Sequence, residues 1–253
     1  MLRINGLTVS FGSVSVLKNI SFECKRGEVT AVIGPNGAGK TTLFDTVTGF
    51  TAALTGSVEC GGTKVSGLAP FLVARAGLSR TFQTPRLFDR MTVLENLKVA
   101  HEDEGLLQLA ISALTRSGEL HHDLAASKKA IEILKSLQLE HVKDNFAADL
   151  SGGQRKLVEL GRALMTDPQY LLLDEPVAGV APALVEDIGR RLRELADGGL
   201  GVVLIEHNMD FVMKVSDYVV VMTNGSVLTS GAADEVRADP RVLEAYLSGA
   251  TEL

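Results

Sequence analysis

One glycine-rich segment, GPNGAGKT at residues 34–41, constrains the fold of this chain more than any other part of it. Gly34 is followed by four residues and then by Gly39, Lys40 and Thr41, which is the complete P-loop pattern. Glycines allow several backbone N–H groups to converge on one anion, because a Cβ would obstruct either the turn or the phosphate. The segment therefore predicts a pocket for a nucleoside triphosphate.

The surroundings of this loop support the same interpretation. Val29–Ile33 is a short apolar run typical of a buried strand, and residues 40–49 follow a helical pattern, so the phosphates would lie at a helix N-terminus. Lys40 would bring positive charge to the β- and γ-phosphates, and Thr41 would supply an oxygen for Mg²⁺. An ordinary glycine-rich turn is the alternative. The residues of this loop expected to hold the nucleotide are Asn36, Gly37, Ala38, Gly39, Lys40, Thr41 and Thr42.

Composition limits the classes of protein to consider. The chain has 253 residues, of which 45% are hydrophobic and 22% charged, which are ordinary values for a globular protein. A formal net charge of −6 does not suggest a basic footprint, so no nucleic-acid partner is expected. Two cysteines form no disulfide framework, and the N-terminus lacks the apolar core of a signal peptide, so the cytoplasm is expected. No run approaches the roughly 20 apolar residues that span a bilayer.

Strand and helix patterns alternate along most of the chain, which predicts an α/β fold with a largely parallel sheet. The segments that read as single strands are 2–9, 16–22, 29–33, 170–173, 202–205 and 218–222. A further pair of short strands is expected over 56–65. The segments that read as helices in the second half are 183–196, 210–215 and 234–247.

From about residue 70 to residue 145 the pattern is helical instead. Ala126, Ala130, Leu134 and Leu137 recur at helical spacing and predict one buried helix face. We therefore expect a single domain whose core comprises residues 1–69 and 146–253, with a helical insertion over 70–145.

Two acidic residues follow an apolar run in YLLLDEP, at positions 170–176. A strand would deliver Asp174 and Glu175 at its C-terminal end, where ligands bind in open α/β sheets. Asp174 would help to hold Mg²⁺, and Glu175 would polarise the attacking water. A solvated acidic turn is the alternative for this motif alone, and the P-loop makes that alternative unlikely.

Two further polar residues are candidates for the same site. His207 follows the next apolar run, VVLIEHN, and its imidazole could orient water, Glu175 or the γ-phosphate. Gln83, in RTFQTPR, could contact Mg²⁺ or water through its amide. Without the other motifs, the simpler interpretation of either residue is a structural role.

A second phosphate-reading element is predicted at LSGGQ, residues 150–154. Ser151 is a good N-cap, and the two glycines leave backbone N–H groups unobstructed at the start of a helix. Two such elements in one chain suggest that ATP is sandwiched between the P-loop of one subunit and the serine–glycine turn of another, head to tail. The residues expected to contact nucleotide there are Ser151, Gly152, Gly153 and Gln154.

In this order, GPNGAGKT, Gln83, LSGGQ, LLLDEP and His207 resemble the ATP-binding subunit of an ABC transporter over essentially the whole chain. The resemblance implies a P-loop ATPase core with a mostly parallel sheet, an antiparallel β subdomain and an inserted helical subdomain. It implies ATP and Mg²⁺ as ligands. It also implies that Phe11 stacks on adenine and that Val16 lines the same ring.

The flanking segments RTFQTPRLFDRMTVLENL and ADEVRADPRVLEAYL resemble branched-chain amino-acid importers, in particular their larger ATP-binding subunit. That resemblance implies membrane-spanning permease subunits, a second ATPase subunit (identical or related), and indirectly a solute-binding protein, with this chain peripheral at the cytoplasmic face of the membrane. Many members of the wider family have Asp where Ala181 stands here, which puts communication between the two ATP sites in doubt.

A docking surface for the membrane partner is expected near the start of the helical insertion. The residues that suggest it are Arg75, Arg80, Phe82, Arg86, Leu87, Phe88 and Arg90. A solvated basic face is the plainer alternative for each arginine. Other functions are a transporter ATPase for urea, amides or lipid export, or an ABC ATPase that acts outside transport.

Overall fold

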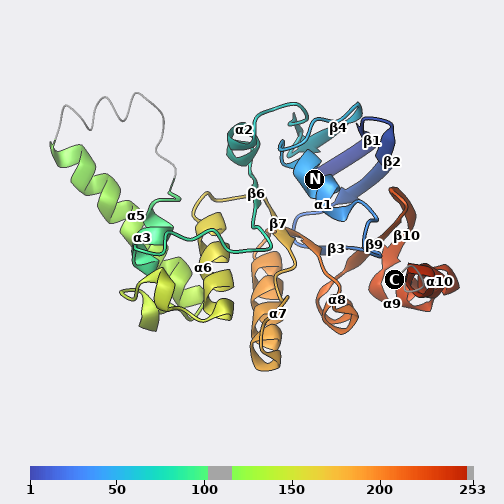
Figure 1. Ribbon diagram of the computed structural model, residues 1–253. Helices are drawn as coiled ribbons and strands as arrows, with labels where there is room; N and C mark the ends of the chain where they lie inside the picture. Colours follow the sequence, from blue (N-terminus) through green and yellow to red (C-terminus); the bar gives the residue numbers. More distant parts are fainter. Residues whose placement is uncertain (102–115, 250–253) are drawn as a thin grey trace. The chain divides into compact units, whose positions relative to one another are not determined.

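The computed structural model describes residues 1–101 and 116–249 of the chain (Figure 1). They form two compact units, a sheet unit and a helical unit. The sheet unit comprises Met1–Gln83, Pro168–Ala178 and the chain from Pro182 onward. The helical unit comprises Thr84–Asp167 together with Gly179–Ala181.

A six-stranded sheet forms the centre of the sheet unit, in the order β10-β9-β3-β8-β7-β6. All neighbouring strands are parallel except β10, which is antiparallel to β9. The expected parallel sheet is therefore confirmed. The strands are β3 (Val29–Ile33), β6 (Leu78–Arg80), β7 (Tyr170–Asp174), β8 (Gly201–Ile205), β9 (Tyr218–Thr223) and β10 (Ser226–Ala232).

A second, antiparallel sheet belongs to the same unit and has the order β2-β1-β4-β5. Its long hairpin alternates buried and exposed residues, as expected of strands with one face on a core. The strands are β1 (Leu2–Phe11), β2 (Val14–Cys24), β4 (Thr55–Cys60) and β5 (Thr63–Lys64).

The main core lies between these two sheets, with α1 (Lys40–Val47) as part of it. Leu43 and Phe44 of α1 share this core with Val32, Leu172 and Val203, which lie on one face of the six-stranded sheet. Figure 1 shows α7 (Pro182–Asp197) and α8 (Met209–Val215) on the opposite side of that sheet. Because both faces are covered, every residue of β3, β7 and β8 is buried, and nearly all of them are apolar.

Within the described residues 84–101 and 116–167, the helical unit has three α-helices: α3 (Val93–Lys98), α5 (Arg116–Ser136) and α6 (Gly152–Leu164). Two short 3₁₀ turns, Glu140–Val142 and Ala147–Asp149, lie between α5 and α6. The predicted face of α5 is confirmed, since Ala126, Ala130, Leu134 and Leu137 are all at most 3% exposed. Gly161 of α6 lets the three helices approach closely, because a Cβ there would lie within 3.4 Å of side chains on α3 and α5.

Three local expectations differ from the structure. The segment expected to be helical from residue 70 contains only α2 (Pro70–Arg75) before strand β6, whose three residues Leu-Ser-Arg carry no strand pattern of their own. Strand β10 was not expected. The terminal helix is two helices, α9 (Ala233–Ala238) and α10 (Pro240–Gly249), because Pro240 cannot continue α9.

Both cysteines, Cys24 and Cys60, are free and buried, which agrees with the absence of a disulfide framework. Burial raises the pKa of the Cys24 thiol to about 12. A search of residues 1–101 and 116–249 finds no helix long and apolar enough to cross a membrane.

Candidate active site

The P-loop joins β3 to α1, and its glycines are required by their surroundings. Gly34 has φ 148°, and a Cβ there would lie 2.1 Å from the carbonyl oxygen of Met222. Gly39 is the N-cap of α1 with φ 96°, and a Cβ there would lie 2.8 Å from the side chain of Leu17. At Gly37, by contrast, no protein atom lies within 4 Å of the Cβ position, so this side of the loop is open.

A cavity of about 260 Å³ lies over this loop. It brings the P-loop together with four residues from other parts of the chain, Val16, Glu175, Ile205 and His207. The complete lining is Val16, Asn36, Gly37, Ala38, Gly39, Lys40, Thr41, Thr42, Glu175, Ile205 and His207. All seven residues of the loop that the sequence assigns to nucleotide binding thus face one space.

Lys40 is buried, with 6% of its surface exposed. Its ammonium group donates hydrogen bonds to the carbonyl oxygens of Gly34, at 2.7 Å, and Pro35, at 2.9 Å. Burial lowers the pKa of Lys40, and the charges of Glu175 and Asp174 partly counter that effect. The cation is therefore held inside the loop by neutral acceptors, which a phosphate group can replace.

Glu175 is the centre of the polar cluster at this cavity. Its Oε2 accepts a hydrogen bond from the Gln83 amide at 2.7 Å, and its Oε1 lies 3.2 Å from Nε2 of His207. The structure thus brings together the three residues that the sequence nominates for catalysis. The backbone of Glu175 has φ 50°, a left-handed conformation that non-glycine residues adopt at a cost of about 1–3 kcal/mol and that concentrates at functional sites.

Sequence reasoning missed the role of Glu206, which is only 2% exposed. Its carboxylate accepts hydrogen bonds from the backbone N–H groups of Val177 at 2.9 Å, His207 at 3.0 Å and Asn208 at 3.4 Å. It therefore ties the chain after β7 to the chain after β8, and so fixes His207 relative to Glu175. The available signal was a carboxylate directly after a fully apolar strand.

Asp174 is the last residue of β7 and is buried. Its Oδ2 accepts a hydrogen bond from Arg80 at 2.9 Å, and the Arg80 side chain is only 5% exposed. The expectation that Arg80 contributes to an exposed docking surface is therefore wrong. The strand pairing of β6 beside β7 draws this side chain inward, towards the carboxylates.

Three predicted metal ligands offer oxygen atoms, which are the donors that Mg²⁺ prefers. They are the exposed hydroxyl of Thr41, the carboxylate of Asp174 and the amide oxygen of Gln83, whose amide nitrogen is already engaged with Glu175. Within the part of the chain that the structure describes, no group of three or more His, Cys, Asp or Glu side chains could hold a metal ion. This donor set fits a metal ion that shares its coordination with phosphate oxygens.

Phe11 lies at the end of β1, and 55% of its surface is exposed. It does not line the P-loop cavity, whereas Val16 does. An exposed aromatic ring at the tip of the β1–β2 hairpin is available for stacking, and its assignment to adenine stays a prediction.

The second predicted anion-binding element lies in the helical unit. Ser151 is the N-cap of α6, and it forms a capping box with Gln154: its side chain accepts from the Gln154 N–H, and its own N–H donates to the Gln154 side chain. Around Gly152 no protein atom approaches within 4 Å of the Cβ position. Neither α1 nor α6 has an acidic residue in its first turn, whereas α3, α8 and α9 do. Both helix starts therefore suit an anion.

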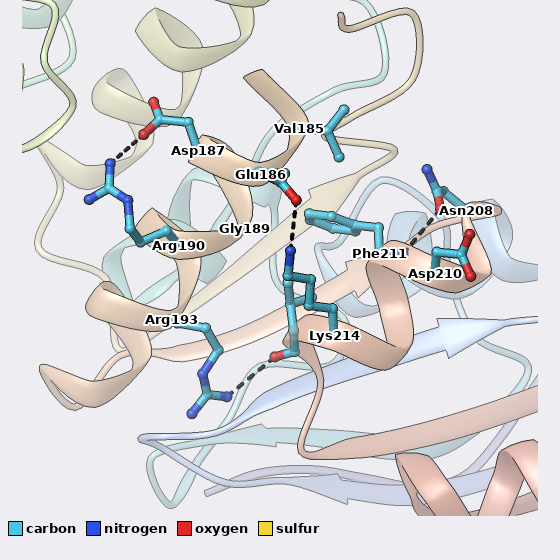
Figure 2. A pocket seen from close by; sticks show the side chains of 11 residues that line it. Val185, Glu186, Asp187, Gly189, Arg190, Arg193, Asn208, Asp210, Phe211 and Lys214 are labelled. Atoms are coloured by element: carbon cyan, nitrogen blue, oxygen red, sulfur yellow. Dashed lines mark hydrogen bonds and ion pairs between the residues drawn. The ribbon is translucent and has the colours of Figure 1, made fainter. Parts of the chain in front are cut away.

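A larger cavity of about 650 Å³ lies between α7 and α8 (Figure 2). The apolar residues of its lining include Val185, Phe211 and Val215. Its cations already have acidic partners: Lys214 bridges the two helices to Glu186 at 2.9 Å, as Figure 2 shows, and Arg190 and Arg193 pair with other carboxylates. The P-loop cavity, with its open glycine loop and converging catalytic groups, is therefore the better candidate for the site.

Comparisons with known proteins agree with this geometry. A family model described as ABC transporter matches residues 17–178, and a second, described as branched-chain amino acid ATP-binding cassette transporter, matches residues 226–247. The probable branched-chain amino acid transport ATP-binding protein LivG of Methanocaldococcus jannaschii is 39% identical over 251 residues, which cover 98% of this chain and 97% of that protein.

Solved structures show the same similarity. A nucleotide-free ATP-binding cassette from an ABC transporter superposes with a TM-score of 0.85 at 38% identity, covering 97% of this chain and 98% of the other. The dimeric post-hydrolysis state of another ATP-binding cassette, bound to ADP and Pi, superposes with a TM-score of 0.74 at 25% identity, covering 92% and 99%.

The position of the Lys40 ammonium group predicts the effect of removing it. Lys40→Ala is expected to weaken ATP binding about 10- to 100-fold, because a hydrogen bond to a charged group contributes about 1.5–3 kcal/mol. Equilibrium titration with a fluorescent ATP analogue measures this. Lys25→Ala is the matched control, since Lys25 is exposed and pairs with Glu28. Equal affinities for all three proteins would contradict the assignment of the loop.

Proposed function

Because the chain belongs to the ABC transporter family, whose ATP-binding domains are ATPases coupled to transport, we propose that it is the ATP-hydrolysing subunit of a membrane importer for branched-chain amino acids. One observation supports the ATPase role most directly. The Glu175 carboxylate is held between Gln83 and His207 at the cavity over the P-loop. A general base at that place can reach a water molecule beside a bound γ-phosphate.

ATP binding rests on the loop and the helix behind it. The open backbone around Gly37 and the N-terminus of α1 supply N–H groups for the phosphates, and no first-turn acid opposes them. Lys40 exchanges its two carbonyl partners for phosphate oxygens. Thr41, Asp174 and Gln83 would hold Mg²⁺, which when bound neutralises charge on the β- and γ-phosphates.

Hydrolysis then requires an oriented water molecule. The water oxygen attacks the γ-phosphorus while its proton passes to the Glu175 carboxylate, and the bond from that phosphorus to the bridging oxygen of ADP breaks. Gln83 and His207 hold Glu175 in place from opposite oxygens of its carboxylate. The products are ADP and inorganic phosphate.

The site is completed by a second subunit in this proposal. Ser151 and the glycines after it form an acid-free helix start with open space around Gly152, and they belong to a different unit from the P-loop. A head-to-tail dimer places this turn of one subunit on the γ-phosphate bound by the other. That the solved cassette bound to ADP and Pi is dimeric supports a dimer for this chain as well. Because a γ-phosphate favours closure and ADP does not, hydrolysis drives opening.

Ala181 is the place where this dimer departs from the wider family. It is exposed, and the preceding Gly179 has φ 69° with no protein atom within 4 Å of its Cβ position. An alanine methyl group accepts no hydrogen bond, so Ala181 cannot supply the side-chain hydrogen bonds that an aspartate would make between the two ATP sites.

Membrane-spanning permease subunits are the partners proposed for force transfer, with this chain held at the cytoplasmic face of the membrane by them. Exposed apolar side chains on the sheet unit suit such a contact: Phe50 after α1, and Phe71 and Leu72 on α2. The two elements are adjacent, since a Cβ at Gly49 would lie 2.5 Å from the carbonyl oxygen of Leu68. Phe50 also packs edge-on against Phe82, next to Gln83, which links this surface to the site.

The helical unit offers an exposed aromatic of its own. Phe88 is 46% exposed and lies under the guanidinium of Arg162, 5.1 Å from its ring centre. Asn96, fully buried, donates to the carbonyls of Phe88, Met91 and Thr92 and accepts from the Phe88 N–H, so the loop that carries this ring is well ordered.

The cargo is inferred from relatives rather than from the site. The C-terminal segment 226–247 matches a model for branched-chain amino acid cassettes, and the LivG protein named above carries that transport role. The cargo contacts a solute-binding protein and the permease. This chain therefore contributes to transport of the cargo only through those proteins. The second ATPase subunit is either an identical chain or a related one.

Glu175→Gln is expected to lower steady-state ATP hydrolysis about 10²- to 10⁴-fold while leaving ATP binding intact, because the amide keeps the size of the carboxylate but cannot take a proton. Light scattering during size-exclusion chromatography is expected to show a dimer with ATP and a monomer with ADP. Unchanged steady-state hydrolysis by the variant would remove Glu175 from its role.

Cargo is tested in proteoliposomes that contain the chain with its co-purified permease and solute-binding protein. Leucine, isoleucine or valine is expected to stimulate ATP hydrolysis, and urea or an amide is not. If urea or amides stimulated ATP hydrolysis and the three amino acids did not, the proposed cargo would be wrong. The proposed ATPase role would not be affected by that result.

A further inference from the structure

We infer that Arg80 is a positioning residue for the metal-binding carboxylate Asp174, and that it joins the three elements that carry the proposed Mg²⁺ ligands. The inference rests on the proposed ATPase function. It concerns a residue that contacts neither nucleotide nor reacting atoms and acts through Asp174.

The first observation is the shared ion pair. Arg80 ends strand β6, and its guanidinium donates to Oδ2 of Asp174 at 2.9 Å and also to Oδ1 of Asp45. The side chains of Arg80 and Asp174 are 5% and 8% exposed. In such a setting an ion pair is screened far less than at the surface, and a planar guanidinium fixes the direction of each carboxylate it binds.

The second observation is the aromatic enclosure of the cation. The guanidinium carbon lies 5.6 Å from the ring centre of Phe44 and 5.3 Å from that of Phe82. These rings keep water away from the ion pair and add a cation–π attraction. The guanidinium is thus held by four side chains, which belong to α1, to β7 and to the loop that follows β6.

The third observation is where those elements lead. Asp45 and Phe44 lie on α1, which begins at Lys40 and Thr41; Phe82 directly precedes Gln83. Asp174 ends β7. Each of the proposed metal ligands Thr41, Gln83 and Asp174 therefore stands on an element, or in the adjoining loop, that Arg80 contacts.

Charge explains how this arrangement assists a metal ion. One guanidinium serves two carboxylates, so the cluster keeps a net negative charge. Arg80 occupies Oδ2 of Asp174 and leaves Oδ1 for a metal ion or its water. Without Arg80, the buried Asp174 loses the group that fixes the direction of its carboxylate. Removing a hydrogen-bond partner of a metal ligand typically lowers the metal affinity about 10- to 100-fold.

The test is a titration of Mg²⁺ against equilibrium binding of ATP, followed with a fluorescent analogue under conditions without turnover. Arg80→Met is expected to raise the Mg²⁺ concentration for half-maximal binding about 10- to 100-fold. Its affinity for ATP in EDTA is expected to match the wild type, because the P-loop and Lys40 are unchanged.

Arg191→Met is the matched control. The Arg191 side chain is 2% exposed and pairs with Asp187 on α7, so its loss removes a partly buried ion pair away from the P-loop cavity. It is expected to lower thermal stability without changing the Mg²⁺ titration. An Arg80→Met titration that coincides with this control would overturn the inference.

A more conservative variant covers the case in which Arg80→Met does not fold. Arg80→Lys keeps the positive charge but replaces the planar guanidinium, which binds two carboxylates, by a single ammonium group. The Mg²⁺ concentration for half-maximal ATP binding is therefore expected to be lower for Arg80→Lys than for Arg80→Met. It is expected to be higher for Arg80→Lys than for the control variant Arg191→Lys. If Arg80→Lys needed no more Mg²⁺ than the wild-type protein, the bridging role of Arg80 would be overturned. If ATP binding by the wild-type protein did not depend on Mg²⁺, the proposed function itself would be contradicted.

Discussion

The parallel pairing of β3, β8 and β7 is the constraint on which the site depends. These three neighbouring strands end at the same edge of the sheet, where β3 leads into the P-loop, β8 leads to His207, and β7 leads to Asp174 and Glu175. Their apolar residues are buried on both faces, so a shift in register would disturb two layers of packing at once. Burial of the sheet therefore fixes the positions of the catalytic groups.

Polar contacts refine what the sheet positions. Glu206 ties the chain after β7 to the chain after β8, and Arg80 ties β6 and α1 to Asp174. Buried charges are costly unless they are paired, and here each is paired with a group that belongs to another element. The same bonds that satisfy these charges hold Glu175 and Asp174 relative to the loop.

Much of this arrangement could be predicted from sequence, for identifiable reasons. The glycine spacing of the P-loop and the apolar run before Asp174 and Glu175 are local patterns, and strand ends that meet at one edge follow from parallel topology. The three residues of β6 could not be predicted, because Leu78 and its neighbours form a strand only through pairing with β7. The buried position of Arg80 depends on the same strand pairing, which its local sequence does not indicate. The role of Glu206 depends on backbone N–H groups that only the fold brings together.

The central claim is that each nucleotide is held by two subunits, the P-loop of one and the Ser151 turn of the other. Mixing Lys40→Ala with Ser151→Arg chains tests it, under conditions in which the wild-type chain alone hydrolyses ATP. Each variant alone is expected to be nearly inactive. In a mixed dimer both lesions fall in one site and the other site is intact, so random pairing is expected to restore about a quarter of the wild-type rate. A mixture no faster than either variant alone, with subunit exchange shown by differently labelled chains, would contradict the account.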